Sequence, residues 1–141
     1  MVARHGTFDH TGPVSGLMPP KIPTKSVPPN IIDVMEDPNV FGPWFQGVTW
    51  DAWKVFLKAL FGLMLSPEER ETYWKHTGRQ NPPAAQASEG WLVVGRRGGK
   101  SLISALIAVF LACFREYSAV LAPGERGIVM VIAADRQQAR V

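Results

Sequence analysis

WLVVGRRGGKS, residues 91–101, contains the clearest structural signal in the chain. Four apolar residues, 91–94, lead into a loop of glycines and arginines, and Lys100 and Ser101 then open a long apolar run that ends at Phe114. A strand, a glycine-rich loop and a helix in this order are typical of a phosphate-binding loop. The stretch therefore predicts a nucleotide site at the start of the helix.

The loop residues have separate roles in this predicted site. The glycines, Gly95, Gly98 and Gly99, let the backbone turn several N–H groups toward one anion, and the start of the helix adds unsatisfied N–H groups and its dipole. Lys100 is expected to reach the β- and γ-phosphates, and the Ser101 hydroxyl is expected to bind Mg²⁺. The predicted cofactors are ATP and Mg²⁺.

The match to the phosphate-loop pattern is a variant. The full pattern G-x-x-x-x-G-K-[ST] would place a glycine at Val94, whereas the glycine comes one residue later. The alternative is a glycine-rich turn between a strand and a helix, with a lysine facing solvent. The flanks favour the nucleotide site, because a second β-prone run, IVMVIA at 128–133, would complete a right-handed strand–helix–strand unit. The expected fold is therefore α/β, a P-loop NTPase with a mainly parallel sheet flanked by helices.

Composition excludes several other classes. The chain has 141 residues, 46% of them apolar, which suits one domain or part of a larger one. Its net charge of +3 permits an anionic partner without requiring one. A single cysteine, Cys113, excludes a disulfide framework and fits a reducing compartment, and the scattered histidines predict no zinc site. The longest apolar run is shorter than the roughly 20 residues that span a bilayer, so no membrane is expected.

The sequence divides into three expected parts. Residues 1–30 are rich in Pro and Gly and are expected to form a disordered arm. Residues 31–88 are expected to form a helical, aromatic-rich lead-in segment, and residues 89–141 the start of a truncated ATPase core. In the lead-in, Thr49 is expected to cap a helix with aromatic residues at helical spacing, and Ser66 to cap the next one before Pro67.

Two further groups of polar residues have open interpretations. In many P-loop motors related to helicases a glutamine upstream of the loop reads the adenine edge, and Gln46, before the aromatic helix, is the available candidate because its amide both donates and accepts. Arg136, Gln137 and Arg140 follow the second expected strand, where ligands gather in open α/β sheets. They face nucleic acid or a neighbouring subunit, or they form the polar side of an ordinary helix.

Four segments together resemble the large terminase subunit of tailed bacteriophages. The likeness covers about residues 41–141 and is strongest from residue 89 onward. The segments that carry it are WDAWKVFLKALFGL (50–63), GRRGGKS (95–101), SLISALIAVFLACF (101–114) and APGERGIVMVIAADRQQAR (122–140). The resemblance implies the N-terminal portion of an ATPase that uses ATP hydrolysis to translocate DNA into a capsid. In that family the loop often reads R-x-x-G-K-[ST], so the missing first glycine is ordinary there.

The resemblance also implies roles and partners. Arg96, with Arg97 as the alternative, would stabilise charge on the transferring phosphoryl group beside Lys100, because a fixed guanidinium meets the equatorial oxygens. The implied partners are double-stranded DNA, the portal and the small terminase subunit, and the full-length protein would form a homo-oligomeric ring. The implied location is the host cytoplasm, docked on the procapsid.

Some elements of that family are not recognisable in this sequence. No apolar strand ending in Asp and Glu follows the loop, and there is no cluster of nuclease carboxylates. The chain is therefore expected to be the front part of an ATPase domain that binds nucleotide weakly and hydrolyses it poorly or not at all. Two alternatives stay open: a helicase-like P-loop ATPase of another role, and a non-catalytic interaction module with a relic loop.

Overall fold

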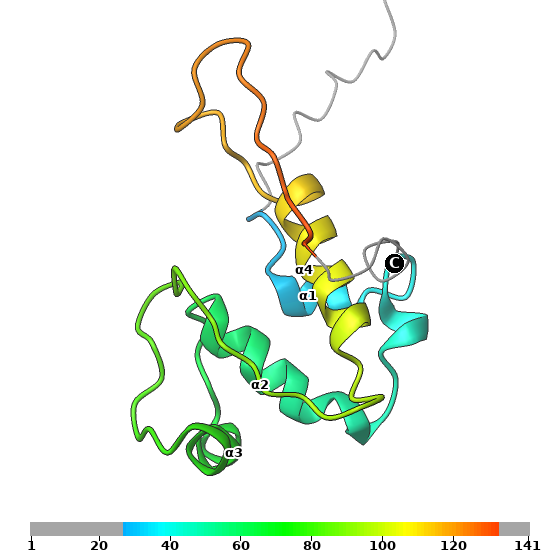
Figure 1. Cartoon of the computed structure of the whole chain (residues 1–141), viewed down its shortest axis with the longest axis vertical. Coiled ribbons are helices and arrows are strands. Elements are labelled where there is room, and N and C mark those ends of the chain that lie inside the picture. Colours follow the sequence, from blue (N-terminus) through cyan, green and yellow to red (C-terminus); the bar gives the residue numbers. More distant parts are fainter. Residues whose placement is uncertain (1–26, 133–141) are drawn as a thin grey trace, which may run out of the picture.

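The computed structural model describes residues 27–132, and helices are the only regular elements in this part of the chain (Figure 1). The α-helices are α1 (Ile31–Glu36), α2 (Asp51–Leu60), α3 (Pro67–Thr77) and α4 (Lys100–Cys113), and the 3₁₀ helices are η1 (Gly42–Trp44) and η2 (Val48–Trp50). The predictions for most of the expected arm and for the polar residues Arg136, Gln137 and Arg140 concern residues 1–26 and 133–141, which lie outside the described residues.

Two of the helices begin at reciprocal caps. At α1 the Asn30 side chain accepts from the N–H groups of Ile32 and Asp33, while the Asp33 carboxylate accepts from the Asn30 N–H. At α3 Ser66 and Glu69 form the same capping box, and Pro67 occupies the first helical position. The predicted start of α3 is thus confirmed, because both orphan N–H groups find local partners.

The predicted cap of α2 is wrong. Thr49 lies inside η2, and α2 begins at Asp51 with no side-chain cap. The chain enters this region through Gly47 at a φ of 89°, which leads into a tight 3₁₀ turn rather than into the extended conformation that an N-cap residue needs. The aromatic helix itself is present, with Val55, Leu57 and Ala59 buried.

The core lies among α1, α2 and α4. Its fully buried side chains are Ile31, Met35, Leu57, Ile103, Leu106 and Phe110. A smaller cluster joins α2 to α3 through Val55, Ala59, Leu65 and Tyr73. Burying apolar area contributes about 25 cal/mol per Å², so these contacts are the main term that holds the helices together. None of the described helices is long and apolar enough to cross a bilayer.

The expected parallel sheet is wrong for residues 27–132, which contain no β-strand. Residues 91–94 are extended, but they run beside a helix: Ala87 N–H donates to the Leu60 carbonyl at the end of α2, and Gly98 lies beside Trp53 near its beginning (Figure 1). A helix keeps its own backbone groups paired, so it offers this segment no ladder.

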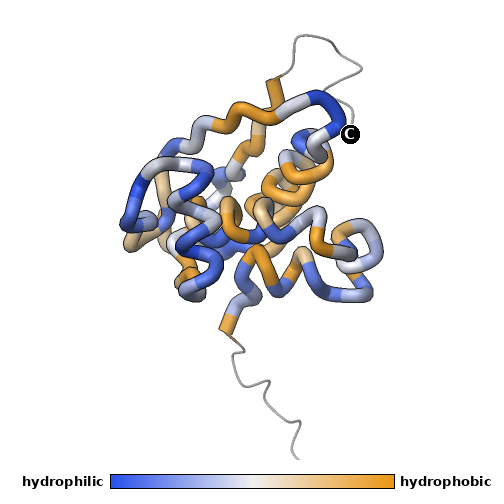
Figure 2. The backbone as a smooth tube through the Cα atoms, turned by 90° about the horizontal axis from the view of Figure 1, so that it is seen from below, coloured by the Kyte–Doolittle hydropathy of each residue, from blue (hydrophilic) through white to orange (hydrophobic). Residues whose placement is uncertain are grey.

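The second expected strand has the same outcome. Residues 128–132 are extended without strand pairing, and Ile128, Met130 and Ile132 are 84%, 74% and 85% exposed. A strand of a parallel sheet is buried on both faces, so this exposure is incompatible with the predicted strand–helix–strand unit. Figure 2 shows apolar residues in the extended segments as well as in the helices.

Candidate anion-binding loop

The loop before α4 is held by two tryptophans of the aromatic segment. The Trp53 indole N–H donates to the Gly98 carbonyl across 3.0 Å. A Cβ added to Gly99 would lie 2.8 Å from Cζ3 of Trp50, so the backbone passes directly against that ring. Trp50 is in turn packed edge-on against Phe45, with ring centroids 4.8 Å apart. Aromatic contacts therefore fix the position of the loop.

The backbone of the loop alternates between left-handed and right-handed conformations. Arg97 and Gly99 have φ angles of 62° and 80°, in the left-handed region, and Gly98 lies between them. The Gly98 N–H donates to the Gly95 carbonyl across 3.2 Å, which closes a turn. Alternating hands turn successive N–H groups toward one side and form an anion-binding concavity. Arg97 is the only non-glycine residue with positive φ among residues 27–132, and such conformations concentrate at functional sites.

The first turn of α4 adds further donors. Gly99 is the N-cap, makes no side-chain cap, and no acidic residue lies in the first turn. The N–H groups at the start of a helix have no intrahelical acceptor, and the helix dipole places partial positive charge there. This end of α4 thus has the donors and the potential that an anion requires.

Three cationic side chains belong to the loop and the first turn of α4. Arg96, Arg97 and Lys100 are exposed and, within the described part of the chain, form no ion pair. The ion pairs that are present, Lys54–Glu36 and Lys58–Glu69, lie elsewhere. The charge of the loop is therefore uncompensated by neighbouring carboxylates, which favours an anionic ligand.

A metal ion has fewer possible protein ligands here. Ser101 is exposed at the second position of α4, so its hydroxyl is open to a metal-bound phosphate. Residues 27–132 contain no group of three or more His, Cys, Asp or Glu side chains that could hold a metal. Any Mg²⁺ at this loop would depend on phosphate oxygens and Ser101 rather than on a carboxylate cluster.

The structure brings the loop residues 95–101 together but does not connect Gln46 to them. Gln46 is exposed between η1 and η2, and its amide makes no hydrogen bond to the residues described. Trp50 and Trp53, which the sequence indicated only as members of a core-facing helix, are the residues that hold the loop. The paired glycines were the available signal, because adjacent glycines often permit close approach by a large side chain.

Comparison with known proteins adds no family assignment. No protein-family model matches the chain, and no similar curated protein or solved structure was found. The resemblance to terminases therefore depends on the quoted sequence segments alone.

Proposed function

We propose that residues 95–101 bind the triphosphate of Mg²⁺-ATP, and that the chain is the ATP-binding part of a viral DNA-packaging motor of the terminase large-subunit type. One observation carries the phosphate site: the uncapped start of α4 follows a loop with left-handed residues at Arg97 and Gly99. This arrangement favours an anion without requiring a sheet behind it.

Each loop residue has a part in the proposed site. Backbone N–H groups from Gly99 onward surround the phosphates, and the exposed ammonium of Lys100 reaches the terminal ones. Arg96 or Arg97 supplies a guanidinium for the charge that spreads over the γ-phosphate oxygens. Ser101 provides a hydroxyl ligand for Mg²⁺.

The wider role is an extension of the family resemblance. In it, ATP hydrolysis is coupled to translocation of double-stranded DNA, the chain acts in a homo-oligomeric ring with the portal and the small terminase subunit, and the motor is docked on the procapsid in the host cytoplasm. The ATP site is the part of this proposal that a binding experiment tests directly.

A non-catalytic interaction module is the second candidate. Trp91 and Val93 are 89% and 106% exposed, and residues 128–132 are exposed as well. Apolar surface of this extent is typical of contacts with another protein. In this case the loop would be a relic, and it would bind ATP no better after Mg²⁺ is added.

Calorimetric titration with Mg²⁺-ATP separates the two candidates. Lys100→Ala should weaken binding at least tenfold, because a hydrogen bond to a charged group is worth about 1.5–3 kcal/mol. Lys75→Ala is the matched control, since Lys75 is an exposed lysine on α3 outside the loop. Equal affinities for the native chain and Lys100→Ala, or no binding by the native chain, would refute the phosphate site.

A further inference from the structure

A cavity of about 660 Å³ lies between α2, α3 and the segment 87–98. This volume is within the range of about 300–1,000 Å³ found for small-molecule sites. Gly95 and Gly98 of the anion-binding loop are among its lining residues, so the cavity borders the loop.

The cavity exists because the segment 87–98 is attached to α2 at both ends and not in the middle. At one end Ala87 N–H donates to the Leu60 carbonyl, and Gly90 passes so close that an added Cβ would lie 3.1 Å from Leu60 Cδ1. At the other end Trp53 holds Gly98. The residues between these attachments pass over the helix and leave the space open.

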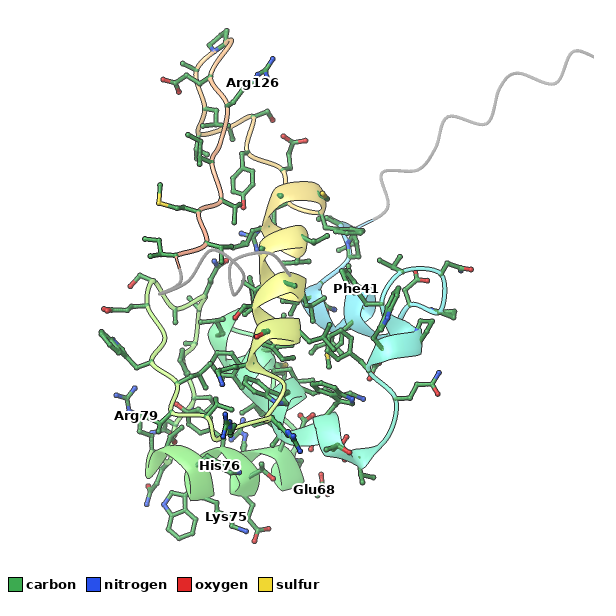
Figure 3. All side chains as sticks on the ribbon, turned by 45° about the vertical axis from the view of Figure 1, so that its right-hand side comes forward. Phe41, Glu68, Lys75, His76, Arg79 and Arg126 are labelled. Atoms are coloured by element: carbon green, nitrogen blue, oxygen red, sulfur yellow. The ribbon has the colours of Figure 1, made fainter. Side chains whose placement is uncertain are left out.

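The lining combines aromatic surface with a few polar groups. Trp53, Phe56 and Tyr73 present rings from α2 and α3, and His76 and Arg79 contribute polar groups. Figure 3 shows His76 and Arg79 toward the segment that carries the loop, whereas Lys75 extends from the other side of α3. Apolar walls with few polar groups are typical of sites for planar organic ligands.

Glu89 and Trp91 form part of the rim. The Glu89 carboxylate accepts a hydrogen bond from the Trp91 indole N–H across 2.9 Å, which orients that exposed ring. A carboxylate has acceptor capacity for more than one donor, so Glu89 can also accept from an amino or hydroxyl group of a ligand. Gln46, the residue that the sequence suggested for reading the base, does not line this cavity.

We propose that this cavity binds the nucleoside of the nucleotide whose phosphates occupy the loop before α4. The proposal rests on the proposed ATP site for the position of the phosphates. The base lies against the rings of Trp53, Phe56 and Tyr73, and Glu89 accepts from the base or the ribose. Gly95 and Gly98 border both parts, so one ligand spans the cavity and the loop.

Three probes, measured by calorimetry, test the cavity separately from the loop: adenosine, tripolyphosphate with Mg²⁺, and Mg²⁺-ATP. Ala52→Phe is the main variant, because Ala52 is exposed on α2 and lines the cavity, so the added ring can occupy part of the space without disturbing the core. Ala112→Phe on the exposed side of α4 is the matched control. Trp91→Ala is a second variant that removes part of the rim from an exposed position.

The native chain should bind ATP at least tenfold more tightly than tripolyphosphate, and it should also bind adenosine alone. Ala52→Phe should weaken adenosine binding at least tenfold and bring ATP affinity closer to that of tripolyphosphate. Trp91→Ala should weaken adenosine binding, and Ala112→Phe should change neither affinity. Equal affinity for ATP and tripolyphosphate in the native chain, or ATP and adenosine binding unchanged in a cooperatively folding Ala52→Phe, would overturn the cavity assignment. Neither result contradicts the proposed phosphate site. If Lys100→Ala does not weaken the binding of tripolyphosphate, the phosphate site is refuted, but the adenosine site is not.

Discussion

Replacing Gly99 by alanine should destabilise the protein through two separable effects. Gly99 has a φ of 80°, and an L-residue in the left-handed region costs about 1–2 kcal/mol. The new Cβ would also lie 2.8 Å and 3.0 Å from Cζ3 and Cη2 of Trp50. Overpacking against a rigid ring costs about 1–3 kcal/mol more. Gly99→Ala is therefore expected to lower the free energy of unfolding by about 2–5 kcal/mol.

Two other glycines provide matched controls. Gly78 has a φ of 68° at the end of α3, but an added Cβ would meet nothing within 4 Å, so Gly78→Ala isolates the backbone cost of about 1–2 kcal/mol. Gly95 has neither positive φ nor a neighbour within 4 Å, so Gly95→Ala should lie within about 0.5 kcal/mol of the native chain. The difference between Gly99→Ala and Gly78→Ala then measures the contact with Trp50.

Urea denaturation followed by far-ultraviolet circular dichroism is the assay, because it reports all the helices at once. Trp50→Leu provides the second half of a double-mutant cycle: the smaller side chain should relieve the clash, so the double variant should be less destabilised than the sum of the single variants by about 1–3 kcal/mol. Equal destabilisation by Gly99→Ala and Gly78→Ala, or additivity in the cycle, would refute the close packing of the loop on Trp50.

Two further variants test the core and the cap. Phe110→Ala should lower the free energy of unfolding, measured by urea denaturation, by about 3–5 kcal/mol, because Phe110 is 2% exposed. Val109→Ala, at a position 37% exposed, should lower it far less. Similar losses in the two variants would contradict the orientation of α4. Burial raises the pKa of Glu69, but hydrogen bonds from the Lys58 ammonium and the Ser66 N–H outweigh it, so the pKa lies below its ordinary 4.5. The ionised carboxylate stabilises the fold above that value and loses this effect as the pH falls through the lowered pKa, so Glu69→Gln should flatten the decline of the urea midpoint below about pH 4.5. If the urea midpoint of Glu69→Gln declines at acid pH as it does in the native chain, Glu69 does not contribute to this pH dependence.

The helices were predictable because their signals are local. The Ser66 cap with Pro67 and two glutamates fixes the start of α3 within a few residues of sequence, and the long apolar run before Phe114 corresponds to α4. Capping and periodic burial act within one or two turns, so one segment contains the information. The start of α2 was missed because the positive φ of Gly47 selected a 3₁₀ turn before the helix.

The expected strands failed because strand formation is not local. A run such as 128–132 has the composition of a buried strand, but composition does not supply a neighbouring strand for its N–H and C=O groups. Residues 91–94 instead lie in a segment that is attached to α2 on either side of them, for example by Trp53 to Gly98, which are 45 positions apart. No pattern within residues 91–94 indicates that their neighbour is a helix.

The loop shows the same division between local and distant information. Its glycines, arginines, Lys100 and Ser101 could be selected from the motif, because phosphate binding needs those residue types at that spacing. The cavity beside it could not, since the cavity depends on how the segment 87–98 is attached to the two ends of α2.

The contacts that hold the loop connect it to the helical core. In the expected fold a sheet strand would hold the loop, whereas here Val93 is fully exposed and the fixed points are the indoles of Trp50 and Trp53. Helix α1 packs on both α2 and α4, so the helix that holds the loop and the helix that the loop begins share one core. A ligand that binds only where α2 and α4 are correctly placed would therefore stabilise that whole core, by RT ln(1 + [L]/Kd) when free ligand is in excess.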